Sequence, residues 1–83
     1  MKSYIKLIEK QNKRNIRVSE LNGVYWVSLK TRGLEISAFW NEREEFGKIE
    51  FNSQYWRRND GSEELDAEVW TNILSNCIDL MDF

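Results

Sequence analysis

The sequence predicts an α+β fold: a four-stranded antiparallel meander sheet, a C-terminal helix packed on one face of that sheet, and a short N-terminal helix before it. Three observations lead to this prediction. An Asn-Gly pair separates two runs of alternating apolar and polar residues, two further alternating runs follow, and the C-terminal segment repeats apolar residues at helical spacing. With 83 residues, the chain is expected to form a single domain, residues 1–83.

The N-terminal segment is expected to be a helix over residues 4–13, with Ser3 as its cap. Four side chains then share one face at positions i, i+3, i+4 and i+7: Tyr4, Leu7, Ile8 and Gln11. The alternative is a strand with Ile5 and Leu7 on one face. The Lys, Gln and Asn residues that end the segment disfavour a strand, so the helix is preferred.

The clearest local signal is Asn22-Gly23 between residues 16–21 and 24–29. Asn and Gly both tolerate the positive φ angles of a two-residue hairpin turn. Such a turn leaves one register, with five cross-strand pairs: Ile16–Leu29, Val18–Val27 and Glu20–Tyr25 on one face, and Arg17–Ser28 and Ser19–Trp26 on the other.

Two more strands are expected after the hairpin. Residues 30–33 form a turn, and the third strand, residues 34–40, alternates Leu, Ile, Ala and Trp on one face. Residues 41–46 form a charged connection to a fourth strand over residues 47–56. Arg57 to Gly61 is interpreted as a loop.

The last helix is expected to start at Asp60 or Ser62, where a short polar side chain caps the first turn and nearby carboxylates favour its positive end. Its apolar stripe contains eight residues: Leu65, Val69, Trp70, Ile73, Leu74, Cys77, Ile78 and Met81. The stripe should cover the apolar face of the sheet, with Cys77 as an inert thiol of the core.

The composition gives no catalytic machinery. The chain has no histidine and one cysteine, which excludes His-based catalysis, an intramolecular disulfide and a thiolate zinc site. Nothing isolates two of the carboxylates in an apolar pocket, as tuned acid–base catalysis requires. The chain is therefore expected not to be an enzyme, and to use no cofactor and no metal.

No apolar run approaches the roughly 18 residues that a membrane span needs, and no signal peptide opens the sequence. The expected location is therefore the cytoplasm, with no membrane partner.

Charge is unevenly distributed along the chain. Residues 1–33 carry a net charge of +6, whereas residues 34–83 carry −8. Charge segregation of this kind favours a charged partner, although folding can also mix the two halves on one surface.

Aromatic residues interleave with polar ones on the sheet face turned away from the C-terminal helix. Trp26, Phe39 and Trp56 are expected there, among Arg17 and Lys48. Three interpretations stay open. The N-terminal helix covers this face in a three-layer fold, or the face binds a protein, or it stacks the bases of a nucleic acid.

One resemblance rests on the layout of Ile16-Arg17-Val18, Leu21-Asn22-Gly23, Trp26-Val27-Ser28-Leu29 and Gly33-Leu34-Glu35, with a helix before and an apolar helix after. In this layout the chain resembles small immunity proteins of bacterial toxin systems and, more broadly, phage-encoded inhibitors of host defence. The resemblance implies a protein that works by occlusion, without turnover.

The expected function is therefore that of a non-catalytic protein-binding inhibitor of immunity, antitoxin or anti-defence type. It would occlude a basic surface of a nuclease or another nucleic-acid-handling partner, as a monomer or homodimer. The candidate binding residues are an aromatic anchor with its basic neighbours, three loop glutamates and two aromatics of the sheet: Trp56, Arg57, Arg58, Glu42, Glu44, Glu45, Trp26 and Phe39. The alternatives are a single-stranded nucleic-acid-binding module that uses the sheet aromatics and the N-terminal basic residues, and an assembly subunit.

Overall fold

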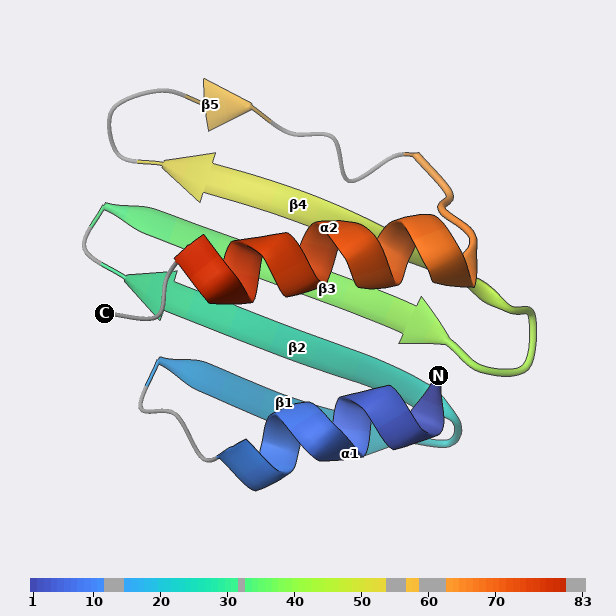
Figure 1. Cartoon of the computed structure of the whole chain (residues 1–83). Coiled ribbons are helices and arrows are strands. Elements are labelled where there is room, and N and C mark those ends of the chain that lie inside the picture. The colour runs from blue at the N-terminus through green and yellow to red at the C-terminus, as the bar shows by residue number, and fades with distance from the viewer. Residues whose placement is uncertain (12–14, 32, 54–56, 59–62, 81–83) are drawn as a thin grey trace.

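The computed structural model describes residues 1–11, 15–31, 33–53, 57–58 and 63–80, and it has the expected α+β architecture (Figure 1). The elements follow one another as α1 (Lys2–Gln11), β1 (Ile16–Leu21), β2 (Val24–Thr31), β3 (Leu34–Asn41), β4 (Phe46–Ser53), β5 (Arg57–Arg58) and α2 (Ala67–Leu80). The sheet is an antiparallel meander in the order β1-β2-β3-β4-β5. The four long strands confirm the predicted sheet.

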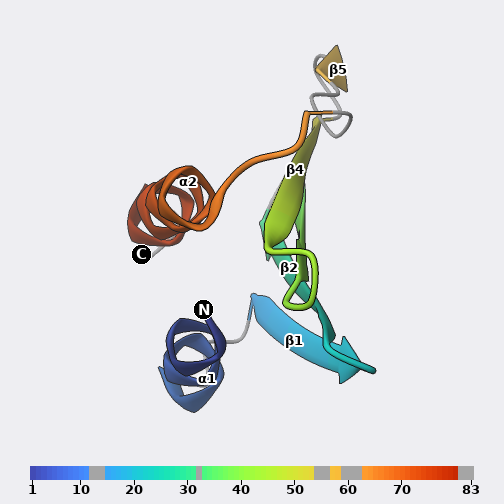
Figure 2. The ribbon, with the colours of Figure 1, turned by 90° about the vertical axis from the view of Figure 1, so that its right-hand side faces the viewer.

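Both helices lie on the same face of the sheet, α1 over β1 and α2 over the centre (Figures 1 and 2). Thr71 of α2 donates its hydroxyl hydrogen to the sulfur of Met1, the residue immediately before α1, at 3.7 Å. The fold therefore has two layers, and the three-layer interpretation is wrong. The physical reason is that α1 carries its own apolar stripe and buries it against the same core as α2.

The core lies between the helices and the sheet. Its buried side chains are Ile5, Ile8, Tyr25, Val27, Leu29, Ile36, Ala38, Trp40, Ile49, Trp70, Leu74 and Ile78. At its centre the rings of Trp40 on β3 and Trp70 on α2 pack with centroids 5.4 Å apart. The strand residues of this set alternate along the sequence, so every second side chain faces away from the helices.

The β1–β2 hairpin has the predicted turn and register. Asn22 has φ 52° and Gly23 has φ 81°, both in the left-handed region. All five predicted cross-strand pairs are present, and Leu21 pairs with Val24 beside the turn. The turn therefore decides which residues of both strands face the core.

We expect Gly23→Val to destabilise the protein by about 1–2 kcal/mol, because a side chain at positive φ meets its own backbone and a β-branched one is strained most. The added Cβ would meet Arg43 no closer than 3.8 Å, so the penalty comes from the backbone conformation. Urea unfolding followed by circular dichroism measures the change. Gly23→Asn is the matched control and should be nearly neutral, since Asn tolerates this conformation. A Gly23→Val variant as stable as the wild type would contradict the turn geometry.

Helix α1 begins earlier than predicted. It starts at Lys2, and the Met1 carbonyl accepts the Ile5 N–H at 3.1 Å, so Ser3 lies inside the first turn and is not the cap. The buried residues are Ile5 and Ile8, whereas Leu7 is 54% exposed. The strand alternative is wrong, and the predicted residues 12 and 13 lie outside the described part of the chain.

Helix α2 begins later than predicted, at Ala67. Asp66 is its cap: its carboxylate accepts the Val69 N–H at 2.9 Å. Leu65 is not helical, because its backbone pairs with Gly47 of β4 through two hydrogen bonds of 2.9 and 2.7 Å. Val69 is exposed at the edge of the predicted stripe. Asp60, Ser62 and Met81 lie outside the described residues.

The fourth strand starts at Phe46, one residue earlier than predicted, and is described to Ser53. The predicted continuation over residues 54–56 lies outside the described part. Arg57–Arg58 was expected to be a loop, but it forms β5, which pairs Arg57 with Asn52 and Arg58 with Phe51. β5 lies along the edge of β4 that does not face β3, and it pairs with backbone groups that β3 leaves without a partner.

Candidate binding surface

The sheet face opposite the helices carries three aromatic side chains in contact, one from each of three neighbouring strands. We call Trp26 of β2, Phe39 of β3 and Phe46 of β4 the aromatic row. Trp26 and Phe39 are direct cross-strand partners, with ring centroids 6.0 Å apart in an edge-to-face arrangement. Phe39 and Phe46 are 5.8 Å apart and tilted. Such pairs stabilise one another beyond simple burial and hold the rings in place.

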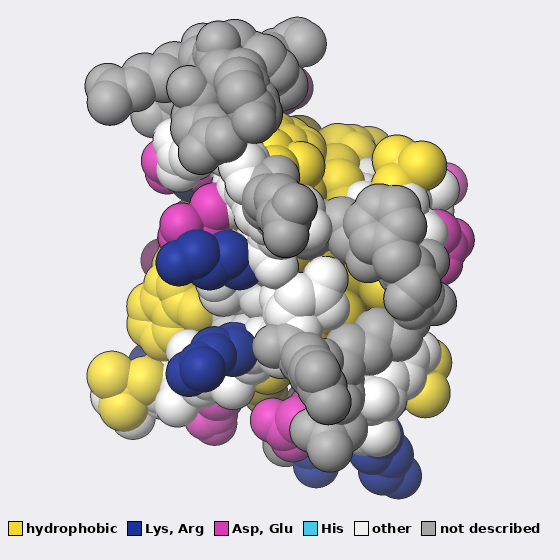
Figure 3. Space-filling model, turned by 90° about the vertical axis from the view of Figure 1, so that its left-hand side faces the viewer, with side chains coloured by type: hydrophobic (Ala, Val, Ile, Leu, Met, Phe, Trp, Pro, Cys, Tyr) yellow, Lys and Arg dark blue, Asp and Glu magenta, His cyan; other side chains and the backbone are white. Residues whose placement is uncertain are grey.

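The aromatic row is accessible chiefly at Trp26. Trp26 is 42% exposed and neighbouring Leu21 is 63% exposed, whereas Phe39 and Phe46 are half-buried. Within the described ranges, no helix lies over this face (Figure 2). Figure 3 shows the molecule from the side, with hydrophobic, basic and acidic side chains close together on the surface away from the helices. A contiguous exposed apolar patch with a polar rim is typical of an interaction surface.

An acidic loop adjoins the aromatic row. This loop, residues 42–45, connects β3 to β4 and contains three glutamates. The Asn41 carboxamide oxygen shapes it by accepting the backbone N–H groups of Arg43 at 3.0 Å and Glu44 at 3.1 Å. Glu45 has φ 56°, an uncommon conformation for a residue with a side chain. The loop leads directly into Phe46 at the start of β4, so its charge lies at one end of the row.

The three glutamates have different roles in the structure. Glu42 is half-buried, and its carboxylate accepts the indole N–H of Trp40 at 2.8 Å. Its backbone N–H donates to the Gly23 carbonyl at 3.0 Å, which joins the acidic loop to the hairpin turn. Glu42 therefore holds the loop in place, whereas Glu44 and Glu45 are exposed to solvent.

The structure brings some of the predicted site residues together and separates others. Trp26 and Phe39 lie in the aromatic row, next to the acidic loop with its three glutamates. Arg57 and Arg58 pair with the far end of β4 and are not near that loop. Trp56, the predicted anchor, lies outside the described residues.

Phe46 was missed from the sequence because it was assigned to the charged connection. The alternation of the strand could have indicated its position. Phe46 lies two residues before Lys48, so both side chains lie on the same face of β4, and the sequence predicts Lys48 on the polar face. Leu21 and Val24 were missed in the same way, at the ends of strands whose parity was known.

Among the side chains that the structure describes, three cations share the open face with the aromatic row: Arg17, Lys30 and Lys48. Lys48 is directly opposite Phe39, whereas Arg17 and Lys30 lie further along the sheet, away from the acidic loop. The open face therefore has the acidic loop at one end and Arg17 and Lys30 at the other, where Glu35 and Glu50 share the same face. The aromatic row lies between the acidic loop and Arg17.

The part of the chain that the structure describes shows no group of three His, Cys, Asp or Glu residues placed to hold a metal ion. Cys77 is half-buried and packs against the core. Burial raises the pKa of its thiol, which leaves less of the reactive thiolate at neutral pH.

Neither described helix has both the length and the apolar character that crossing a membrane requires. Comparisons of the chain with protein-family models, with curated proteins and with solved structures found no match. The class of protein is therefore defined by fold and surface alone: an α+β domain whose meander sheet keeps an aromatic face open.

Proposed function

We propose that this chain is a non-catalytic protein-binding inhibitor of the immunity, antitoxin or anti-defence type, which occludes a basic surface of a nuclease or another nucleic-acid-handling partner. One observation carries the proposal: the aromatic row lies on the open sheet face, with Trp26 exposed and Phe39 and Phe46 half-buried, and it ends at the acidic loop. A surface that binds phosphates must present Lys and Arg side chains, and exposed carboxylates complement them.

Charge and aromatic contact play different parts in this function. Exposed ion pairs contribute only about 0–1 kcal/mol each, so Glu44 and Glu45 chiefly accelerate association. Tight binding needs an apolar anchor that becomes desolvated in the complex. Trp26 has the geometry of such an anchor, because Phe39 holds its ring while 42% of the residue stays exposed.

We expect Trp26→Ala to speed dissociation of the complex about 30-fold, the effect of losing a contact of about 2 kcal/mol. The double variant Glu44→Lys with Glu45→Lys should slow association and make it less sensitive to salt. The partner is captured from the native host by the wild-type chain and then purified, and surface plasmon resonance with each variant gives both rates.

The matched control for the charge reversal is Glu9→Lys with Asp79→Lys. These two exposed residues lie on α1 and α2, in the helix layer, and their replacement changes net charge by the same amount on the side of the molecule away from the aromatic row. If both charge-reversed variants slow association equally, the acidic loop is not the contact. If Trp26→Ala binds as the wild type does, the aromatic row is not the interface.

Inhibition by occlusion has a stoichiometric signature. Activity of the captured partner on nucleic acid should fall linearly with added chain and reach its minimum at one chain per active site. Inhibition at a small fraction of that ratio would indicate turnover and contradict the proposal.

A second candidate function is single-stranded nucleic-acid binding. It is favoured by the presence of three cations on the same face as the aromatic row, because stacking platforms with basic neighbours bind bases and phosphates. Micromolar binding to oligonucleotides that weakens steeply with salt, and that is lost with Trp26→Ala, would favour this candidate.

A further inference from the structure

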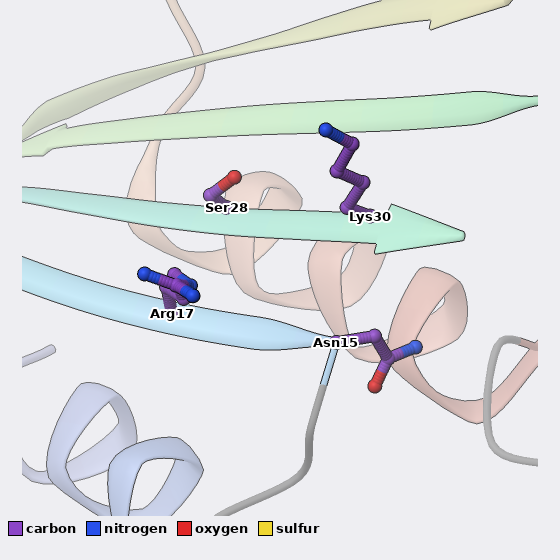
Figure 4. A pocket seen from close by; sticks show the side chains of 4 residues that line it. All are labelled: Asn15, Arg17, Ser28 and Lys30. Atoms are coloured by element: carbon purple, nitrogen blue, oxygen red, sulfur yellow. The ribbon is translucent and has the colours of Figure 1, made fainter. Parts of the chain in front are cut away.

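A hollow of about 290 Å³ lies at the end of the open face that carries Arg17 and Lys30. Four of the described side chains line it: Asn15, Arg17, Ser28 and Lys30 (Figure 4). Asn15 immediately precedes β1, Arg17 lies at the start of β1, and Ser28 and Lys30 lie in the second half of β2. The close-up shows these side chains on the side of the sheet away from the helices.

The β1–β2 register places these four side chains as two adjacent cross-strand pairs. Arg17 is directly opposite Ser28. The Lys30 N–H donates to the Asn15 carbonyl at 2.9 Å, which continues the ladder by one more pair. Directly opposite Cβ atoms are about 5 Å apart, and the next pair on the same face lies about 7 Å further along the strands. The hydrogen-bonded backbones of β1 and β2 therefore fix the positions from which these four side chains extend.

The four described lining side chains are all hydrogen-bond donors, and none of these four is a carboxylate. The planar guanidinium of Arg17 can bind two oxygens of one phosphate, and the ammonium of Lys30 adds a point charge. The hydroxyl of Ser28 and the amide of Asn15 supply neutral donors. This combination fits the several oxygens of a phosphate group.

Trp26 adds a flat apolar surface beside the hollow. It precedes Ser28 by two residues on the same strand and face, so its Cα lies about 7 Å from that of Ser28. Its exposed indole offers a stacking surface within reach of a ring linked to a bound phosphate.

We propose that this hollow is a phosphate-binding site, and that it takes a nucleotide whose base rests on Trp26. The phosphate lies between Arg17 and Lys30 and accepts a hydrogen bond from Ser28. The Asn15 side chain points away from the other three in Figure 4, so it has to turn to another rotamer to donate to the same phosphate. The site needs only Asn15 and side chains of β1 and β2, so it does not depend on the proposed protein partner.

A carboxylate directly opposite Lys30 opposes binding. Glu35 on β3 is exposed and directly opposite Lys30, where it offsets part of the lysine charge. Glu35→Gln removes this charge without touching the lining residues, and it should tighten phosphate binding about two- to fivefold, in the range of a surface ion pair.

The test uses the isolated, isotopically labelled chain titrated in a nuclear magnetic resonance tube. The three probes are inorganic phosphate, thymidine 5′-monophosphate and thymidine. We expect the monophosphate to bind more tightly than either fragment and to shift the backbone signals of Ser28 and Lys30 together with the indole N–H of Trp26. Shifts spread evenly over all basic residues, or no shift near the hollow, would overturn the proposal.

Two matched variants distinguish specific binding at the hollow from nonspecific attraction of the phosphate to positive charge. Lys30→Gln should weaken binding of the monophosphate about tenfold, as loss of a charged hydrogen bond does. Lys10→Gln makes the same charge change on an exposed residue of α1, in the other layer, and should have little effect. Equal losses in both variants would show attraction to net charge only and overturn the site.

A titration with a short oligonucleotide distinguishes a free nucleotide from a nucleic-acid strand as the source of the bound phosphate. A free nucleotide as ligand predicts equal affinity for thymidine 5′-monophosphate and for a short oligothymidylate, since one phosphate and one base are held. An oligonucleotide that binds far more tightly, with Lys48→Gln also weakening it, assigns the same phosphate site to a nucleic-acid strand. Failure of this titration leaves the protein-binding experiment unaffected, so the two proposals fail separately.

Discussion

Replacing Trp70 with alanine should lower the free energy of unfolding by about 3–5 kcal/mol, the usual cost of emptying the space of a buried aromatic ring. Trp70 is fully buried, packs on Trp40, and donates its indole N–H to the Lys48 carbonyl at 3.4 Å. A domain of this size has a total stability of about 5–15 kcal/mol, so the variant should be close to unfolding at room temperature. Urea unfolding monitored by circular dichroism measures the loss.

The matched control is Trp26→Ala, the same substitution on the exposed face. Because Trp26 contributes no buried core contact, we expect its loss of stability to stay near 1 kcal/mol, the worth of its edge-to-face contact with Phe39. Equal losses for the two tryptophans would mean that the aromatic row belongs to the folding core, and it would remove Trp26 as a binding anchor.

Gly47→Ala should also destabilise the protein strongly, by about 1–3 kcal/mol or more. Alanine in a strand normally improves on glycine by about 0.5–1 kcal/mol, so a loss would have the opposite sign to the intrinsic preference. The reason is that the structure leaves no room for a Cβ atom at residue 47. A Cβ at Gly47 would clash with the ring of Trp70, and it would approach the Phe39 carbonyl oxygen and the ring of Trp40 to 2.7 Å each.

A double-mutant cycle tests this cause. The smaller ring in Trp70→Phe should reduce the cost of Gly47→Ala, but not abolish it, because the Phe39 carbonyl and Trp40 remain in place. If the two substitutions add without coupling, or if Gly47→Ala stabilises the chain, then α2 does not pack against β4 as described.

Local signals in the sequence predicted most of the sheet. The two-residue turn at Asn22-Gly23 leaves only one pairing of its flanking strands, so every predicted pair of the hairpin is present. Alternation then assigned the residues of the third strand to their faces. These features depend on neighbours in the chain, which is why a sequence can specify them.

The errors concern contacts between distant segments. Leu65 fits the helical stripe by spacing, but pairing with Gly47 draws its backbone into the sheet and moves the start of α2 to the residue after Asp66. The side of the sheet that α1 covers also depends on the assembled core. The candidate site was half predicted, because its aromatics follow strand parity, whereas the separation of Arg57 and Arg58 from the acidic loop depends on tertiary structure.

The one-sided placement of the helices divides the strand positions into two independent sets. Substitutions at alternate residues such as Leu29 and Ile36 alter the core, whereas substitutions at Trp26 or Phe46 alter the open surface. If the open face is the binding surface proposed above, selection can change recognition at a small cost in thermodynamic stability. A library randomised only at open-face positions should yield many folded variants with new binding preferences, since the residues that specify the fold remain untouched.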